Sequence, residues 1–173
     1  SRLVIRQLID PVTEVEQAEG STMEMETTQI AGIDDTIRKT SGDLAEGASL
    51  IIREKIMTVG DQHAVTDFVV DLNGEGCSAN VVSRSVAKDH SVQEFKSYIN
   101  GNAACAGHSE CDAIIMDNAK VIATPGLIAN NIDASLIHEA AIGKIAGEQI
   151  VKLMTLGLTE AEAEEQIVNG FLK

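Results

Sequence analysis

The sequence has very few aromatic residues, with three Phe, one Tyr and no Trp among its 173 positions. Apolar residues still make up 44% of the chain, so its core has to be built from small and branched aliphatic side chains. Such side chains suit close and repetitive stacking. A chain of this length buries about 70% of its unfolded surface and needs no disulfide or metal in order to fold. We therefore expect one globular domain with a regular aliphatic core.

Basic residues and long apolar runs are also scarce. The chain has 13 Lys and Arg against 27 Asp and Glu, a net charge of −14, whereas a surface that binds phosphates needs an excess of cations. No apolar run approaches the ~20 residues that cross a bilayer, and no basic stretch followed by an apolar segment opens the chain. These absences argue against nucleic-acid and membrane partners and predict a cytoplasmic protein. The three cysteines are too few for a disulfide scaffold and are expected to be reduced thiols.

Motifs that would define an enzyme are missing. A phosphate-binding P-loop needs two Gly bracketing four residues, followed by Lys and then Ser or Thr. The nearest match, Gly143 and Lys144, is followed by Ile145. There is no Gly-x-Ser-x-Gly and no Cys-x-x-Cys. The chain is therefore expected not to be an enzyme and to have no ATPase motif of its own.

Between residues 48 and 145, short β-branched runs alternate with turn residues, as in AVTDFVVDLNGEG and SANVVSRSVAKD. Successive runs begin about 11 to 16 residues apart, so each is one strand plus one turn. An antiparallel sandwich or barrel fits this rhythm, and so does a solenoid of stacked coils with parallel strands. Small aliphatic residues, few aromatics and repeated Asn in turns favour the solenoid, although spacing alone leaves both architectures open.

The regions on either side of this array have different patterns. Residues 1–47 form an acidic lead-in that is partly strand, because STMEMETTQIAG alternates Met and Glu as a half-buried strand does. Its acidic residues fit either a solvated face or a docking surface. Residues 146–173 predict two short helices, the second opened by a capping box of Thr159 and Glu162. These helices are expected to cap the open end of the core or to dock a partner.

Two stretches hold candidate metal ligands. Cys105, His108 and Cys111 lie three residues apart in NGNAACAGHSECDAIIMDNA, which is compatible with a metal site in a loop. The strand-like CDAIIMDNA instead favours a turn at His108 and core packing for Cys105, as for Cys77. In SLIHEAAIG, His138 and the following Glu point to opposite faces of a strand, so they share a site only at a strand end, a bulge or an interface. Thiolate, imidazole and carboxylate together suit iron or zinc.

Three longer segments carry a resemblance to a known family: SRSVAKDHS, INGNAACAGHSECDAIIMDNA and IDASLIHEAAIGKIAGEQIVKLMTLGLTEAEAEEQIVNGFL. From about residue 76 to the end, the chain resembles the C-terminal half of the SufB/SufD family, scaffold proteins of iron-sulfur cluster assembly. Residues 1–75 match less distinctly. The resemblance implies an all-β, right-handed parallel β-helix with a short C-terminal helical cap. The core would then be residues 48–145 and the helical domain residues 146–173.

The resemblance also implies partners. Family members pair through their β-helices, so a homodimer or a SufB/SufD-type heterodimer is expected. They bind an ABC-type ATPase, SufC, through the C-terminal helices, which would explain the missing P-loop. An iron source and a sulfur donor would supply a transient iron-sulfur cluster.

By position, Cys111 matches the cysteine that SufB-type scaffolds use at the nascent cluster, and His138 and Glu139 match their His-Glu pair. SufD-type members retain only the histidine, and SufB-type chains often carry a further Glu where this chain has Ile137. The resemblance therefore implies Cys111, His138 and Glu139 as cluster and metal ligands, with the site completed across a dimer. Two alternatives stay open: a non-catalytic SufD-like subunit that supports a SufB-like partner, and a Cys-His hydrolase with a low-pKa thiolate.

Overall fold

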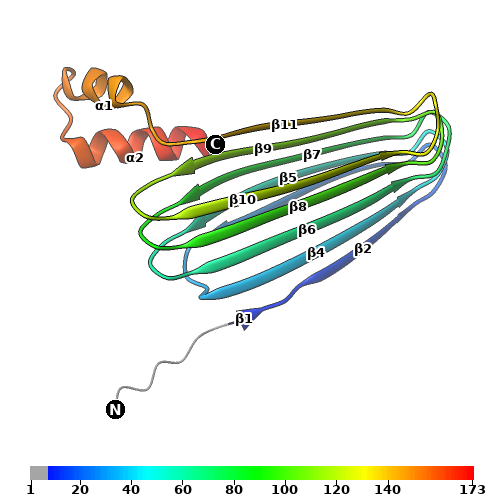
Figure 1. The fold of residues 1–173 in the computed structure, drawn as a ribbon, viewed down its shortest axis with the longest axis horizontal. Coiled ribbons are helices and arrows are strands. Elements are labelled where there is room, and N and C mark those ends of the chain that lie inside the picture. The colour runs from blue at the N-terminus through cyan, green and yellow to red at the C-terminus, as the bar shows by residue number, and fades with distance from the viewer. Residues whose placement is uncertain (1–7) are drawn as a thin grey trace, which may run out of the picture.

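The computed structural model describes residues 8–173, which form a right-handed parallel β-solenoid followed by two short helices (Figure 1). The predicted fold class is therefore confirmed. The strands are β1 (Leu8–Ile9), β2 (Val12–Gln17), β3 (Thr22–Ile30), β4 (Asp35–Leu44), β5 (Ser49–Thr58), β6 (His63–Leu72), β7 (Ser78–Ala87), β8 (Val92–Gly101), β9 (Ala106–Ile115), β10 (Lys120–Ala129) and β11 (Ser135–Gly143), and the helices are α1 (Gly147–Met154) and α2 (Glu160–Phe171).

Successive strands alternate between two parallel sheets. Sheet A has the order β1-β4-β6-β8-β10, with β2 also pairing with β4, and sheet B has the order β11-β9-β7-β5-β3. Asp35, His63, Val92 and Lys120 illustrate the register, because they are Cα partners in successive coils and lie 28 or 29 residues apart in the sequence. This repeat is about twice the predicted strand-plus-turn spacing, since one coil contains two strands and two turns.

Alternate side chains of both sheets point into a narrow aliphatic interior. Leu50 and Ile52 of β5 are fully buried there, and so are Phe68 and Val70 of β6. Burying one such side chain stabilises the fold by about 1.5–3 kcal/mol. The rings of Phe68 and Phe95 meet edge to face with centroids 6.0 Å apart. Two of the four aromatic residues thus pack inside a stack that is mainly aliphatic.

Turn residues stack as regularly as the strands do. Asn130 Nδ2 donates to Asn102 Oδ1, and Asn102 Nδ2 donates to Asn73 Oδ1, both at 2.7 Å. Asn73 Nδ2 continues the ladder by donating to Asp43 Oδ1 at 2.8 Å. An amide group both donates and accepts, so one Asn can serve the coil above and the coil below. The repeated Asn of the sequence therefore stabilises the stacking of like turns.

The acidic N-terminal segment contributes strands to the same stack. β3 pairs with β5, and β4 pairs with β6. Met23 and Met25 pack against the core while Glu24 and Glu26 are exposed, so the predicted alternation is confirmed. The division of the chain into segments 1–47, 48–145 and 146–173 stays a prediction.

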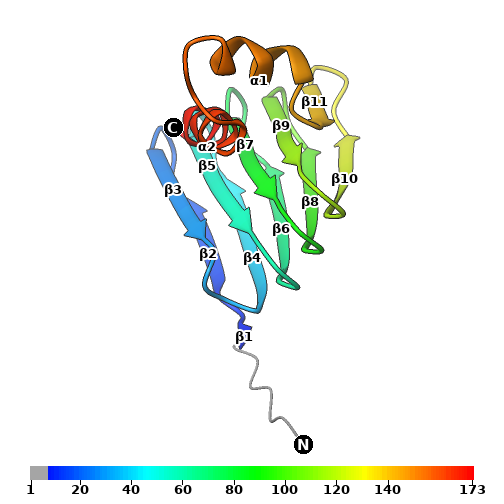
Figure 2. The same ribbon diagram turned by 90° about the vertical axis from the view of Figure 1, so that its left-hand side faces the viewer.

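Both helices lie beside the ends of the sheet-B strands (Figure 2). Val168 of α2 is buried in a small cluster with Val86 and Met116, which lie near the C-terminal ends of β7 and β9. The predicted capping box is present, because Thr159 Oγ1 accepts from Glu162 N and Thr159 N donates to Glu162 Oε2. The helices thus cover strand ends, and β10 and β11 are the edge strands of the two sheets at the C-terminal end of the stack. Within residues 8–173, neither helix has the length and apolar character needed to span a membrane.

Candidate functional site

The residues with candidate ligand groups lie on β9 and β11, which are neighbours in sheet B. His138 is the Cα partner of Ser109, and Ala140 is the partner of Cys111. Paired residues of a parallel sheet point to the same side, and Ser109 and Cys111 are buried, with 0% and 1% of their surface exposed. Cys111 and His138 therefore both face the interior of the solenoid, on neighbouring coils.

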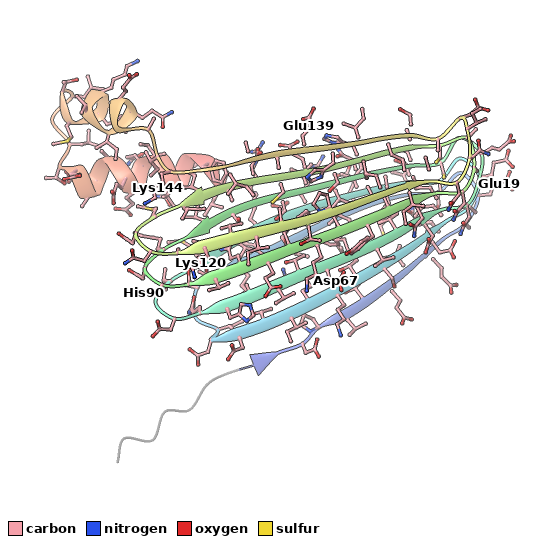
Figure 3. The ribbon with its side chains drawn as sticks, viewed as in Figure 1. Glu19, Asp67, His90, Lys120, Glu139 and Lys144 are labelled. Atoms are coloured by element: carbon pink, nitrogen blue, oxygen red, sulfur yellow. The ribbon has the colours of Figure 1, made fainter. Side chains whose placement is uncertain are left out.

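Glu139 lies on the opposite face of the same strand. Its Cα partner is Glu110, and its side chain is 67% exposed on the outside of β11 (Figure 3). The structure thus brings Cys111 and His138 to one face of sheet B and places Glu139 on the other. Within one chain, the three predicted ligands do not converge on a single point.

The thiol of Cys111 has an unfavourable environment for ionisation. Burial, followed by the negative charges of Asp112 and Glu54, raises the pKa of this thiol to about 12. The thiol is therefore protonated at neutral pH and is a weak nucleophile, which argues against a Cys-His hydrolase. A metal cation reverses this balance, because a coordinating thiol loses its proton to the metal. Cys111 is thus better suited to bind a metal than to attack a substrate by itself.

The imidazole of His138 is half-buried at the open end of the interior. Its Nδ1 atom is buried and makes no hydrogen bond within residues 8–173. An unpaired buried polar group costs about 1–3 kcal/mol. β11 is the last strand of sheet B in the described chain. His138 therefore presents a free ring nitrogen where the interior of the solenoid meets the edge of the stack.

A buried carboxylate stands in the same column of side chains as Cys111. Glu54, Ser83 and Cys111 are Cα partners in three successive coils. Glu54 is 1% exposed; Arg38 Nη1 lies 2.6 Å from its carboxylate, and the hydroxyls of Thr66 and Ser83 donate to it at 3.0 Å each. Burial raises the pKa of Glu54, and Arg38 opposes that shift. The interior beside Cys111 is therefore polar, although it is closed to solvent.

Sequence reasoning missed Glu54, although a signal was present. In IIREKIMT, residues 53–55 are charged in succession, and side chains in a strand alternate between its two faces. Three consecutive charges cannot all face solvent in such a strand. The middle charge shares the face of Ile52 and Ile56, and this is the face that the fold buries.

The prediction that His108 lies in a turn is wrong, because His108 belongs to β9 and faces outward. Its Nδ1 is 3.0 Å from Asn80 Oδ1, and its Nε2 is 3.7 Å from Glu139 Oε2. His108, Glu110 and Glu139 each place one potential ligand atom within 4.8 Å of the others. Burial, together with the hydrogen bond and charge of Asp112, raises the pKa of Glu110. The outer face of the same strand pair therefore gathers its own set of titratable groups.

The other two cysteines have the predicted role in packing. Cys77 and Cys105 belong to the aliphatic core cluster of the solenoid, and all three cysteines are free thiols. Burial raises the pKa of Cys77. The stretch around Cys105, His108 and Cys111 therefore does not form one compact metal site, because both cysteines are buried in the core cluster whereas His108 faces outward.

Fold and site together define a class: a parallel β-solenoid protein that presents a thiol and an imidazole on the interior face near the edge of its last coil. The family model for the SUF system FeS cluster assembly, SufBD core domain, matches residues 11–171. The chain belongs to this family, which confirms the resemblance seen in the sequence.

Curated relatives of the chain are named as iron-sulfur cluster assembly proteins. The chain is 33% identical over 167 residues to an iron-sulfur cluster assembly SufBD family protein of Methanocaldococcus jannaschii, covering 95% of this chain and 53% of that protein. It is 41% identical over 105 residues to a SufBD family protein of Methanothermobacter thermautotrophicus, covering 60% and 26%. It is 35% identical over 100 residues to the iron-sulfur cluster assembly protein SufB of Bacillus subtilis, covering 56% and 22%. These alignments span between 22% and 53% of the length of the relatives.

Proposed function

We propose that this protein is a scaffold subunit of a SUF-type complex, on which a nascent iron-sulfur cluster is built or held before transfer. The observation that supports this most is the placement of Cys111 and His138 on the inner face of neighbouring strands in the last two coils. A thiolate binds iron or persulfide sulfur, whereas imidazole and carboxylate bind iron less tightly than a second thiolate. A mixed set of this kind holds a cluster and also allows it to leave.

A second chain is part of the proposal, because one chain offers fewer ligands than the four that clusters of electron carriers use. The open edges of β10 and β11 present unpaired backbone groups. They also carry the apolar side chains of Ile122, Ile128 and Ile142, which are 49%, 48% and 39% exposed. We infer that a homodimer or a SufB/SufD-type heterodimer forms at this edge. Glu139, on the edge strand, would then serve as a ligand at the interface between chains.

The C-terminal helices are the proposed docking site of a SufC-type ABC ATPase. Val151, Met154 and Leu156 on and beside α1 are 59%, 43% and 73% exposed, and clustered exposed apolar groups mark interaction surfaces. The chain has no P-loop, so ATP-driven movement would have to come from such a partner. That movement would open the chain-to-chain interface to an iron source and a sulfur donor.

Anaerobic reconstitution with iron and sulfide tests the site, in the chain alone and together with a SufC-type ATPase. The wild type is expected to gain the visible absorption of a bound cluster. Cys111→Ser and His138→Ala should lose most of it, while the core variant Cys105→Ala is the matched control and should keep it. Circular dichroism checks that each variant is folded. Equal absorption from the wild type and both site variants would contradict the assignment.

The alternative is a SufD-like subunit that supports a SufB-like partner and binds no cluster itself. The 1% exposure of Cys111 favours it, because a thiol sealed in the core needs an opening before iron can reach it. Co-purification with the ATPase, combined with no cluster in any reconstitution, would favour this alternative. Cluster binding that depends on Cys111 would exclude it.

A further inference from the structure

We propose that His108, Glu110 and Glu139 form a binding site for a divalent first-row transition-metal ion on the outer face of sheet B. The three side chains come from β9 and β11 and project on the side opposite to Cys111 and His138, with Glu139 on the outside of the stack (Figure 3). Their nearest potential ligand atoms all lie within 4.8 Å of one another. One ion could therefore contact all three after small side-chain rotations.

The backbone already holds these ligands in place. Glu110 and Glu139 are direct Cα partners, and His108 lies two residues before Glu110 on the same face of β9. Neighbouring strands are about 4.8 Å apart, so partners on one face are within the span of a single coordinated ion. The hydrogen-bond ladder on both sides of β9 keeps this register. Metal binding would therefore need no rearrangement of the main chain.

The orientation of the His108 ring is set by a contact outside the proposed ligand set. Nδ1 lies 3.0 Å from the side-chain oxygen of Asn80, and an amide oxygen only accepts hydrogen bonds. This contact needs a proton on Nδ1, and in the neutral tautomer that has it the lone pair of Nε2 faces the carboxylates. Nε2 is 3.7 Å from Glu139 Oε2, which is too long for a hydrogen bond. A neutral imidazole whose second nitrogen donates to a carbonyl is the arrangement that orients histidine ligands of metals.

The charges around the site also favour a cation. Glu110, Asp112 and Glu139 contribute three carboxylates on one face of two neighbouring strands, whereas the positive charges that act on Glu110 are those of His108 and Arg84. One imidazole with two carboxylates is a ligand set for Fe²⁺, Mn²⁺, Co²⁺ or Zn²⁺, and it leaves coordination positions open to water. The set contains no sulfur, which separates it chemically from the thiol on the inner face. The outer site shares Glu139 with the proposed site between chains, but it does not depend on cluster assembly at Cys111.

Anaerobic titration of the whole chain with Co²⁺, followed by its visible absorption, tests this site. The wild type is expected to bind one ion without the intense near-ultraviolet band of a cobalt-thiolate bond. His108→Asn and Glu110→Gln should each weaken binding by about tenfold or more, and Asn80→Ala, which removes only the orienting contact, by about tenfold. Calorimetric titration with Fe²⁺ should rank the variants in the same order.

Two controls separate this site from other acidic surfaces and from the inner face. Glu26→Gln removes an exposed carboxylate of β3 on the same face of the sheet, and Cys111→Ser removes the inner thiol. Glu26→Gln should bind Co²⁺ as the wild type does, and Cys111→Ser should keep the Co²⁺ signal that lacks a thiolate band. The proposal is overturned if the wild type binds no Co²⁺, if Glu110→Gln binds as tightly as Glu26→Gln, or if Cys111→Ser abolishes binding. Because the readout is metal binding alone, a failure of cluster reconstitution would leave this result unaffected.

Discussion

The two faces of sheet B place neighbouring residues in opposite environments. Cys111 and Glu110 are adjacent in β9, yet Cys111 is 1% exposed inside the solenoid, whereas Glu110 joins His108 and the exposed Glu139 on the outside. Inside, burial holds a thiol in its protonated form. Outside, carboxylates gather in reach of solvent. Two residues that are adjacent in the strand therefore differ completely in environment: one side chain is a buried, protonated thiol and the next is a carboxylate in reach of solvent.

Ion pairs repeat this contrast. Inside, Arg38 Nη1 lies 2.6 Å from Glu54 Oε1, and the side chain of Glu54 is 0% exposed. Outside, Arg53 Nη1 lies 3.3 Å from Glu24 Oε2, and these side chains are 51% and 63% exposed. The same two residue types therefore form a buried ion pair on one face and an exposed ion pair on the other, and the cost of removing their charges from water differs greatly. The comparison teaches that the face of the strand, more than residue identity, determines what a polar group contributes here.

Arg38→Met tests the inner pair and should have the largest effect. It leaves the Glu54 carboxyl buried without its cation, and breaking a buried pair in this way lowers the free energy of unfolding by about 3–5 kcal/mol. Arg53→Met removes the corresponding cation on the outer face and should lower it by less than about 1 kcal/mol. Urea denaturation at neutral pH measures both. Equal losses would show that the two faces do not differ in the way proposed.

Glycine substitutions test the packing of the two environments. A Cβ at Gly107 would lie 2.8 Å from both Ile99 Cγ2 and Leu136 Cδ2 in the interior, so Gly107→Ala should lower the free energy of unfolding by about 1–3 kcal/mol. A Cβ at Gly126 would overlap the ring of Tyr98, but Tyr98 is 37% exposed and can turn into solvent. Gly126→Ala should therefore lower the free energy of unfolding by less than Gly107→Ala does. A larger loss for Gly126→Ala in thermal unfolding would contradict this ranking.

Alkylation of Cys111 tests whether charges inside the stack control its thiol. Because the pKa is about 12, the rate with iodoacetamide should rise about tenfold per pH unit near pH 8 to 9. Glu54→Gln removes one of the charges that raise this pKa and should accelerate alkylation by less than about tenfold, the factor that corresponds to one pKa unit. Glu139→Gln on the outer face is the control and should leave the rate unchanged. Mass spectrometry of the labelled peptide measures the alkylation rate of each variant. Equal acceleration by Glu54→Gln and Glu139→Gln would contradict the expectation that charges inside the stack control the thiol.

Removing the ion pair between Glu26 and Lys55 should have the smallest effect on stability, because this pair lies exposed on the outer face. The hydrogen bond and charge of Lys55 lower the pKa of Glu26 below its ordinary value of 4.5. A lowered pKa in the folded state stabilises the protein above the unfolded value, and this contribution is lost as the pH falls through the folded value. Lys55→Gln should therefore lose slightly less stability on acidification below pH 4.5 than the wild type. Urea denaturation at about pH 6 and about pH 3, with and without added salt, measures the difference; identical pH dependence would contradict the expectation.

Much of the architecture could be predicted from local patterns. Alternation in STMEMETTQIAG predicts a half-buried strand, and Met23 and Met25 do pack inward. The turn Asn residues and the scarcity of aromatics favour a solenoid, and the capping box at Thr159 is where the pattern places it. These features depend on neighbours in the sequence, so no knowledge of distant contacts is needed to find them.

The site could be predicted only in part. The set of Cys111, His138 and Glu139, completed across a dimer, stays a prediction; within one chain, Glu139 lies beside His108 and Glu110. His108 was expected in a turn because AACAGHSE is rich in small residues, but the stacking of β9 on β7 extends the strand across it. Pairing with a neighbouring coil overrides a weak local preference of this kind.

Through its resemblance to a known family, the sequence determined the parallel solenoid with its helical end, and its alternation determined that His138 and Glu139 lie on opposite faces. Only the tertiary structure decided which groups meet across coils: Cys111 with Ser83 and Glu54 in one inner column, and His108 with Glu139 outside. The physical reason is register. Partners lie 28 or 29 residues apart, so their alignment depends on the length of every turn between them, and a slip of one residue would move every side chain of a strand to the other face.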